Sequence, residues 1–521
     1  MKISKMSLFF GVLLAFISVY FVFWGFGYVE SSSKFIFLIA AVFGIFMAFN
    51  IGGNDVANSF GTSVGSGTLT LTQALMVAAI FEVSGAVLAG GEVTSTIKSG
   101  IVNLSSLHGV SSMDFVYIMM SALMAASVWL LIATKQGWPV STTHAIVGAI
   151  VGSSLTLGFI LESPDVTALS LVKWSQIAKI AFSWILSPLL GGLVSFFVYK
   201  NIKKYILNYN TIAEHKISKI KKAKKKFKKE YKERFDKLSD MEKVEKTEAM
   251  NRDIYTMKDI NYDPEDLDSE YFKKMHELDK KKEDLKSHHA LEKGIPAIAA
   301  IGVAVISSML IFKGLKNVDS GLSSLNKYLI IAMISALTWM AMFIFAKTLR
   351  RSDLSKSTFL MFSWLQVFTA AGFAFSHGSN DIANAVGPFA AIIDALSTGQ
   401  INAKANVPPI IMITFAIALI SGLWFIGKEV ISTVGTKLTK MHPASGFSAE
   451  LSAASVVMIA SILGLPVSST HILIGAVLGI GVVNAQTNWK LMKPIMLAWV
   501  ITLPAAATLS SIGFLIFRAV L

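Results

Sequence analysis

The 521-residue sequence contains no cysteine, and charged residues make up only 15% of it against 53% for hydrophobic residues. The lack of cysteine excludes a disulfide framework, a thiolate metal site and a cysteine nucleophile. A G-x-x-x-x-G-K-[ST] phosphate loop and an H-E-x-x-H zinc motif are also absent. ATP-driven pumping by this chain and zinc-dependent hydrolysis are therefore not expected, and we predict that the chain is not an enzyme.

The hydrophobic composition is typical of a polytopic membrane protein. Of the 80 charged residues, 45 lie between positions 201 and 293, so one soluble insertion carries most of the charge. The net charge of +14 is explained by lysines and arginines beside membrane spans, because cytoplasmic loops are enriched in these residues. We therefore expect the lipid bilayer, and not nucleic acid, as the partner of a multi-pass protein of the cell (inner or plasma) membrane, with the insertion in the cytoplasm.

The fold class predicted is an all-α polytopic membrane protein with about 12–13 transmembrane segments, since a span needs about 20 apolar residues. Apolar runs of that length predict helices near 7–28, 34–51, 72–97, 114–134, 143–161, 175–199, 294–313, 326–348, 358–376, 405–427, 449–464, 470–487 and 493–518. The domains expected are an N-terminal membrane half (1–200), a cytoplasmic charged insertion (201–293) and a C-terminal membrane half (294–521).

Two polar stretches interrupt this apolar sequence, NDVANSFGTSVGS from Asn54 and NDIANAVGPFAA from Asn380. An ionisable aspartate within a span is costly, so each stretch is a functional-site hypothesis by default. Glycines beside the first stretch loosen the helix, and carboxylate and amide oxygens suit a hard cation such as sodium. Helix capping and close glycine packing are the alternative, which the duplication makes less favourable. The predicted coupling-ion ligands in the two stretches are Asn54, Asp55, Asn58, Asn380, Asp381 and Asn384.

A second motif is also duplicated, as GWPVSTTHAIVGAIVG from Gly137 and GLPVSSTHILIGAVLG from Gly464. Two motifs in the same order at matched spacing indicate a duplicated fold. Seven predicted spans separate the two aspartate stretches, and an odd number gives the second copy the opposite orientation. The sequence thus predicts an inverted-topology repeat with broken or re-entrant helices, as in secondary transporters.

In each copy of this second motif a proline precedes three hydroxyl residues, which places the hydroxyls at a helix N-terminus. Free backbone N–H groups and the positive end of the helix dipole bind anions there. An aspartate acceptor would favour an oxyanion that can carry a proton. The predicted oxyanion-binding residues are Ser141, Thr142, Thr143, Ser468, Ser469, Thr470, Asp55 and Asp381.

Four other ionisable residues are candidates with weaker patterns. Glu82 and Glu450 lie within predicted spans, have no acidic counterpart in the other half, and are predicted as coupling-ion ligands or proton carriers. His144 and His471 follow the hydroxyl runs and are candidates for a proton relay, with a hydrogen bond to a neighbouring helix as the alternative. His377 has no histidine counterpart in the first half, and its role stays open.

Together these motifs resemble the inorganic phosphate transporter (PiT) family of phosphate permeases over about 430 residues. The resemblance implies symport of inorganic phosphate with sodium or protons, with no other cofactor, and it implies functional roles for the aspartate, asparagine, hydroxyl and glutamate positions above. The second stretch reads GPFAAII where the first reads GTSVGSG, so Thr62 and Ser63 have no hydroxyl counterparts.

We therefore predict a secondary transporter that imports phosphate by alternating access. A permease for sulfate or another tetrahedral oxyanion, an intramembrane phosphoryl-transfer enzyme and a channel are the alternatives. Sodium or proton coupling, the carriage of phosphate or metal phosphate, and assembly into a homo-oligomer are left open by the sequence.

Overall fold

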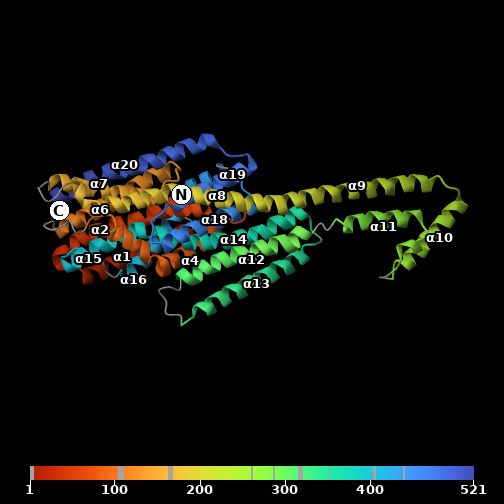
Figure 1. Cartoon of the computed structure of the whole chain (residues 1–521), viewed down its shortest axis with the longest axis horizontal. Coiled ribbons are helices and arrows are strands. Elements are labelled where there is room, and N and C mark those ends of the chain that lie inside the picture. Colours follow the sequence, from red (N-terminus) through yellow and green to blue (C-terminus); the bar gives the residue numbers. More distant parts are fainter. Residues whose placement is uncertain are drawn as a thin grey trace. The chain divides into compact units, whose positions relative to one another are not determined.

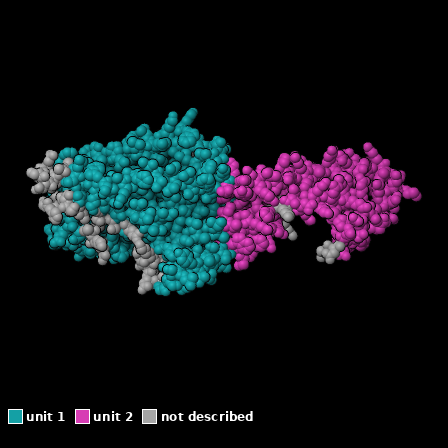
Figure 2. Space-filling view, viewed as in Figure 1, with its two compact units in different colours: residues 1–200, 299–337, 362–521 teal, residues 201–298, 338–361 magenta. Residues whose placement is uncertain are grey.

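The structure is a computed structural model that describes residues 5–103, 111–161, 168–259, 262–285, 288–314, 321–350, 352–402, 407–437 and 440–521. Within these residues the regular structure is helical, apart from one isolated bridge between Val102 and Val172. The all-α fold predicted from composition is therefore confirmed. The chain forms two compact units, residues 1–200, 299–337 and 362–521, and residues 201–298 and 338–361 (Figure 2).

Most residues of the apolar part of the chain belong to the first unit, although residues 338–361, which include the end of one helix and the start of the next, belong to the second. Figure 1 labels the long helices along the chain, and the shorter ones lie between them. Their order is α1 (Lys5–Tyr28), η1 (Ser31–Ser33), α2 (Lys34–Ile51), η2 (Gly52–Val56), α3 (Ala57–Gly65), α4 (Leu71–Ala89), α5 (Gly91–Ser99), α6 (Ser112–Lys135), α7 (Thr142–Ile160), η4 (Ala168–Leu171), α8 (Trp174–Ile202), α12 (Ile295–Met309), η8 (Leu310–Gly314), α13 (Ser324–Thr348), α14 (Leu354–Asp381), α15 (Ala383–Thr398), α16 (Pro409–Ile426), α17 (Lys428–Ser432), η9 (Thr433–Lys437), α18 (Pro443–Ile462), α19 (Ser469–Asn484) and α20 (Trp489–Val520).

Twelve helices of the described chain are long and apolar enough to cross a membrane. A helix satisfies its backbone hydrogen bonds internally, which a segment in lipid requires. The thirteenth predicted span, near 470–487, corresponds to the shorter apolar helix α19 of 16 residues. The number of spans predicted from apolar runs is thus confirmed.

Both aspartate stretches lie where a helix is interrupted. In the first half, α2 passes into the five-residue π-helical turn η2, which contains Asp55, before α3 begins. In the second half, α14 ends at Asp381 and α15 begins at Ala383. Such interruptions leave backbone groups outside the regular helical ladder, and π-helical turns recur at functional sites. The broken helices predicted from the glycine-rich stretches are confirmed.

Close contact between α4 and α14 depends on two glycines. A Cβ atom added at Gly85 would lie 2.1 Å from the carbonyl oxygen of Phe375, and one added at Gly378 would lie 2.2 Å from that of Glu82. Small residues allow membrane helices to approach backbone to backbone, which gives the packing between them. This contact brings Glu82 of α4 beside the last turn of α14.

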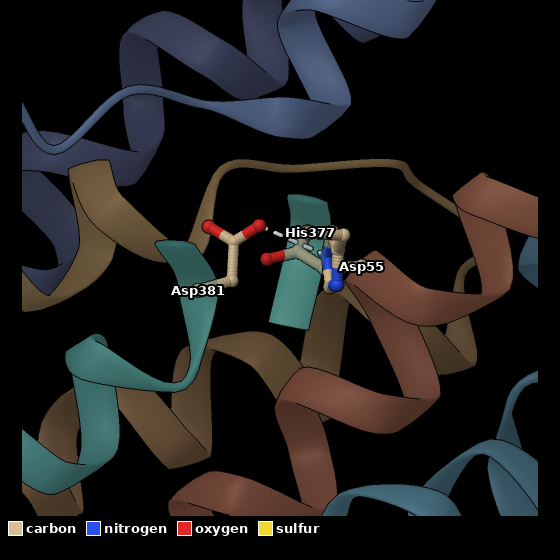
Figure 3. A group of neighbouring side chains, drawn as sticks. All are labelled: Asp55, His377 and Asp381. Atoms are coloured by element: carbon tan, nitrogen blue, oxygen red, sulfur yellow. Dashed lines mark ion pairs between the residues drawn. The ribbon is translucent and has the colours of Figure 1, made fainter. Parts of the chain in front are cut away.

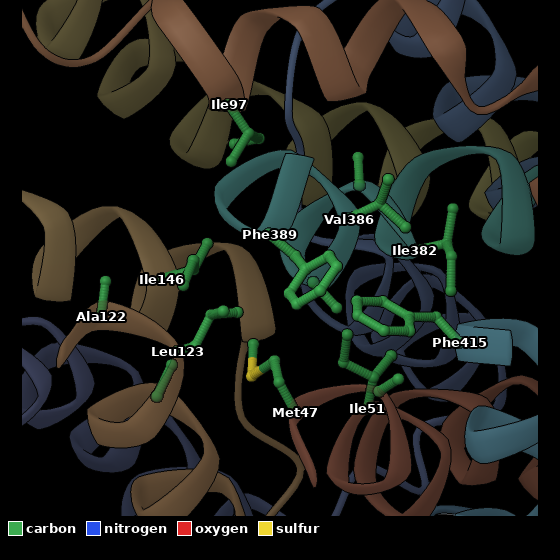
Figure 4. Packing of buried hydrophobic residues seen from close by; sticks show 14 of the residues in the cluster. Met47, Ile51, Ile97, Ala122, Leu123, Ile146, Ile382, Val386, Phe389 and Phe415 are labelled. Carbon is green, nitrogen blue, oxygen red and sulfur yellow. The ribbon is translucent and has the colours of Figure 1, made fainter. Parts of the chain in front are cut away.

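The core of this unit is a cluster of buried apolar side chains. Figure 4 shows Phe389 of α15 and Phe415 of α16 beside Met47 and Ile51 of α2. The centroids of the two phenylalanine rings are 5.1 Å apart with the planes at 60° to each other, an edge-to-face arrangement that suits aromatic pairs. The core therefore holds helices of both halves together next to Asp55 and Asp381.

The second unit includes the polar helices η5 (Lys203–Leu207), α9 (Asn208–Asp236), α10 (Asp240–Thr256), η6 (Pro264–Asp266), α11 (Glu270–Glu283) and η7 (Ala290–Gly294). Two aromatic residues of α9, Phe227 and Tyr231, have ring centroids 6.0 and 5.1 Å from that of Tyr271 of α11. The buried carboxylate of Asp253 accepts hydrogen bonds from the backbone of Asp268 and Ser269. These contacts are structural and give the charged insertion an ordered helical form.

Candidate functional site

The two aspartates of the duplicated stretches converge with a histidine (Figure 3). Asp55 of η2 and Asp381 of α14 are 2% and 1% exposed. A carboxylate oxygen of each aspartate and a ring nitrogen of His377 all lie within 4.8 Å of one another. His377 Nε2 is 2.9 Å from Asp381 Oδ2, and His377 Nδ1 is 2.8 Å from Glu82 Oε2. Glu82 therefore joins the aspartates through His377, which the sequence left without a role.

Hydroxyl groups of the second run contact both aspartates directly. Thr470 Oγ1 donates to Asp55 Oδ1 at 2.7 Å, and Ser469 Oγ donates to Asp381 Oδ2 at 2.5 Å. The first of these bonds joins residues 415 positions apart, one from each half of the chain. The two aspartates predicted for the cation and two of the hydroxyls predicted for the anion thus lie in one buried cluster.

The first hydroxyl run enters the same cluster from α7. Thr143 Oγ1 donates to the carbonyl oxygen of Val467 at 3.0 Å and accepts from Asn384 Nδ2 at 3.3 Å. Both of these partners belong to the second half of the chain. The start of α7 therefore contacts the second half, just as the start of α19 contacts the first half at Asp55. The hydroxyl runs and the aspartates meet where the two halves of the chain pack together.

Each hydroxyl run begins a helix, as the proline spacing predicts. Ser141 is the N-cap of α7 and accepts from the backbone N–H of His144 at 3.1 Å, and Ser468 caps α19 through His471 in the same way at 3.2 Å. The first N–H groups of both helices therefore lie at the buried cluster. Two helix N-termini meeting within a membrane protein are a ready anion-binding arrangement.

Several buried polar atoms around the cluster have no hydrogen-bond partner within the described chain. They include Thr142 Oγ1, Asn384 Oδ1 and Glu82 Oε1. Buried polar groups are nearly always hydrogen-bonded, so such a concentration at one place points to a bound ligand. Carboxylate, amide and hydroxyl oxygens are the ligands of a hard cation, and hydroxyl and backbone N–H groups are donors to an oxyanion.

Glu450 of α18 lies in a separate cage of donors and is fully buried. Thr62 and Ser63 of α3 donate to Glu450 Oε1 at 2.7 and 2.5 Å, and Gln366 Nε2 donates to the same oxygen at 3.1 Å. Thr369 donates to Oε2 at 2.8 Å. This side chain is therefore enclosed by α3, α14 and α18 and does not lie at an exposed helix end.

The asparagines predicted as ion ligands have different surroundings. The amide of Asn54 is bonded to the loop before α7, whereas Asn380 contacts the corresponding loop before α19 through one side of its amide only. Asn384 points its amide nitrogen at Thr143. Asn58 lies in α3, but its side chain is outside the described part of the structure.

The rings of the two histidines predicted as a proton relay lie in a row with those of two tryptophans, called here the aromatic stack, with neighbouring planes tilted by 31–55°. The ring centroids are 3.8 Å apart for Trp184 and His144, 4.6 Å for His144 and His471, and 3.8 Å for His471 and Trp499. Both histidines are at most 6% exposed. The stack joins α8, α7, α19 and α20, and its tryptophans were not singled out from the sequence.

Sequence reasoning missed the partners of Glu450 and the role of His377. Thr62 and Ser63 were set aside because the second half has no hydroxyls at the matching positions, yet the structure brings them to a glutamate 387 and 388 positions away. The density of hydroxyls from Thr62 to Thr70 was the available signal. Gln366 and Thr369 carry no signal of their own in the sequence.

A multi-pass helical protein with a buried polar site shared by its two halves has the architecture typical of membrane transporters. Residues 51–510 match the model of the phosphate transporter family, and the chain is a member of that family. It is 57% identical to a putative phosphate permease of Mycobacterium bovis, over 98% of this chain and 92% of the relative.

More distant proteins agree with this assignment. An inorganic phosphate transporter of Arabidopsis thaliana, described as chloroplastic, is 32% identical over 92% of this chain and 72% of its own length. A solved structure described as the sodium-dependent phosphate transporter has a TM-score of 0.69 and 30% identity, covering 93% of this chain and 100% of that chain. The family and these relatives are transporters and permeases, so the prediction that this chain is not an enzyme is confirmed.

Proposed function

We propose that this protein imports inorganic phosphate by cation symport with alternating access. The observation that carries the proposal is the shared cluster, in which aspartates from both halves contact hydroxyls at the start of α19. Cation and anion would then occupy neighbouring positions, and each would lower the cost of bringing the other into the membrane.

The cation is held by the aspartates in this proposal. Two carboxylates with ligand atoms within 4.8 Å of each other repel when both are ionised, and a cation between them removes that repulsion. Asn58, Asn380 and Asn384 are proposed to complete the coordination, together with the second lone pair of Asn54 Oδ1, whose first accepts from Val140 N. Glu450, with Thr62, Ser63 and Thr369, would hold a second cation at its own cage.

The anion is held by the N-termini of α7 and α19. Backbone N–H groups and the hydroxyls of Ser141, Thr142, Thr143, Ser468, Ser469 and Thr470 would donate to its oxygens without adding formal charge. An oxyanion bound this way is released more readily than one paired with arginine. The protonated oxygen of phosphate would donate to Asp55 or Asp381, which sulfate cannot do.

Sodium is the coupling ion that we propose. Carboxylates and hydroxyls are hard oxygen ligands, and the similar solved transporter is described as sodium-dependent. His144 and His471 are buried in an aromatic stack, which favours a structural role for them over the predicted proton relay. An inverted-topology repeat would make the inward-facing and outward-facing states approximately equivalent in structure. The proposed location of the transporter is the cell membrane.

Uptake of labelled phosphate into proteoliposomes tests the proposal. An inward sodium gradient should drive accumulation, whereas a choline gradient of equal ionic strength should not, and a proton gradient without sodium serves as the rival condition. Accumulation driven by protons alone would overturn sodium coupling. Strong inhibition by equimolar sulfate would overturn phosphate specificity in favour of a general oxyanion permease.

A further inference from the structure

The loop before α7 is fixed by Asn54. Its Nδ2 donates to the carbonyl oxygen of Trp138 at 3.0 Å and to Thr134 Oγ1 at 3.1 Å, and its Oδ1 accepts from Val140 N at 3.1 Å. Both sides of the amide are therefore used, and the backbone on both sides of Pro139 is held. This loop carries the first hydroxyl run.

The loop before α19 has equivalent residues, each 326 or 327 positions after its counterpart in the first half. Its hydrogen bonds to Asn380 are fewer and longer. Asn380 Nδ2 donates to Ser461 Oγ at 3.1 Å and only at 3.5 Å to the carbonyl oxygen of Leu465. Asn380 Oδ1, which would accept from Val467 N by analogy with the first half, is buried and has no hydrogen-bond partner among the described residues. The second loop thus has fewer hydrogen bonds to its asparagine than the first loop has.

The tryptophans of the aromatic stack show the same asymmetry. Trp499 lies on His471 and donates from Nε1 to the carbonyl oxygen of Pro139 at 3.1 Å. Trp184 lies on His144 at the same ring distance of 3.8 Å, but its buried Nε1 has no hydrogen-bond partner in the part of the chain that the structure describes. By the correspondence between halves, its acceptor would be the carbonyl oxygen of Pro466.

We propose that these residues form two alternating latches that position the phosphate-binding loops. The first latch, Asn54 and Trp499, closes the first loop in the state seen here. The second latch, Asn380 and Trp184, closes the loop at Pro466 in the opposite-facing state, while the first latch releases Pro139. The inference rests on the proposed transport cycle and names positioning residues for that same site.

Unequal bonding of equivalent groups is the physical basis for the exchange. A buried donor or acceptor without a partner is costly, so Trp184 Nε1 and Asn380 Oδ1 favour any state that gives them partners. In a duplicated fold such a state exists when the two halves exchange conformations. The two orphaned atoms lie at the positions that this exchange would satisfy, and their counterparts in the other half, Trp499 Nε1 and Asn54 Oδ1, are already bonded.

Substitution of each tryptophan by phenylalanine separates the latches while the ring on the histidine is kept. Trp499→Phe removes a bond of the present state and should raise the population of the other state about 2- to 10-fold, as expected for one hydrogen bond. Trp184→Phe removes a bond of the other state and should lower its population by a similar factor. Trp129→Phe is the matched control, because Trp129 Nε1 bonds Thr502 Oγ1 at 2.9 Å outside both loops.

Fluorine NMR of the full-length protein labelled with 5-fluorotryptophan reads out both latches. The chain has 10 tryptophans, and the resonance missing from each variant assigns Trp184 and Trp499. In the wild type, titration with sodium and inorganic phosphate should move the two resonances between bonded and unbonded environments in opposite senses. In Trp499→Phe the Trp184 signal should shift towards the bonded environment, and in Trp129→Phe neither should move.

Three results would overturn the proposal: movement of both resonances in the same sense, no response of the Trp184 signal in Trp499→Phe, or an equal response in Trp129→Phe. Apparent KM for phosphate measured from one side of oriented vesicles should change in opposite directions in the two latch variants, and equal losses of maximal rate with unchanged KM would count against it. Opposite movements of the resonances in a protein that fails to transport phosphate would leave the latches standing and refute the transport proposal instead.

Discussion

At the scale of single residues, the site depends on buried carboxylates that accept hydrogen bonds from hydroxyl groups. Asp55 and Asp381 each accept from a hydroxyl at the start of α19, and Asp381 also faces His377. Glu450 is surrounded by four donors from α3 and α14. Burying a carboxylate in a membrane protein costs free energy. The hydrogen bonds around the two aspartates and around Glu450 stabilise these carboxylates within the protein interior.

Neutral substitution of either aspartate should abolish coupled uptake. Asp55→Asn and Asp381→Asn keep the size of the side chain but remove the charge that attracts the cation, with an expected loss of about 10- to 100-fold or more in transport. Sodium-driven uptake in proteoliposomes measures this, and size-exclusion chromatography checks folding. Asp114→Asn is the control, since Asp114 pairs with Arg518 at 3.0 Å away from the cluster and should retain uptake.

A Glu450→Gln variant should change the dependence of uptake on sodium. The amide keeps one acceptor oxygen but introduces a donor among groups that already donate, so cation binding should weaken by about 10-fold or more. A sodium titration of uptake at saturating phosphate measures the shift, with Thr369→Ser as a conservative control that keeps the hydroxyl. An unchanged sodium midpoint with reduced maximal rate would assign Glu450 a structural role.

The sequence predicted the aspartates and hydroxyls because each occurs twice at matched spacing. Residues without a counterpart were harder to place. His377 and Gln366 acquire their roles only when α14 packs against α4 and α18, and Trp184 resembles any tryptophan of a membrane helix until its ring is seen on His144. Contacts between residues several hundred positions apart leave no local pattern.

At the scale of elements, the start of each short helix could be read from the sequence, but the contacts between helices could not. The proline and hydroxyl residues predict where α7 and α19 begin, and Ser141 and Ser468 do cap them. The approach of α4 to α14 depends on the fit of Gly85 against a carbonyl oxygen. Glycines are common in membrane helices, so their presence does not say which helix lies opposite.

The contact between α4 and α14 gives a prediction for stability. Gly85→Ala places a methyl group against the carbonyl oxygen of Phe375 and should push the helices apart, lowering stability by about 1–3 kcal/mol. It should also weaken the contact between Glu82 and His377. The thermal unfolding midpoint of the purified protein measures the change, with Gly27→Ala as control because nothing lies within 4 Å of an added Cβ there. An equal midpoint for the two variants would contradict the close approach.

At the scale of the whole molecule, two related halves form one site that neither half contains alone. Thr470 bonds Asp55 and Asn384 bonds Thr143, so the cluster exists only when the halves pack together. Duplication was visible in the sequence, but the interlocking of each half with the loop of the other was not, because it depends on three-dimensional packing.

The central claim is that phosphate and cation bind to one shared site. Isothermal titration of the purified protein tests it most directly, with phosphate affinity measured in sodium and in choline at constant pH and ionic strength, and sodium affinity measured with and without phosphate. The account predicts that each ligand tightens the other by the same factor, as linkage requires, and that Asp381→Asn removes the effect. Equal phosphate affinity in sodium and in choline would contradict it.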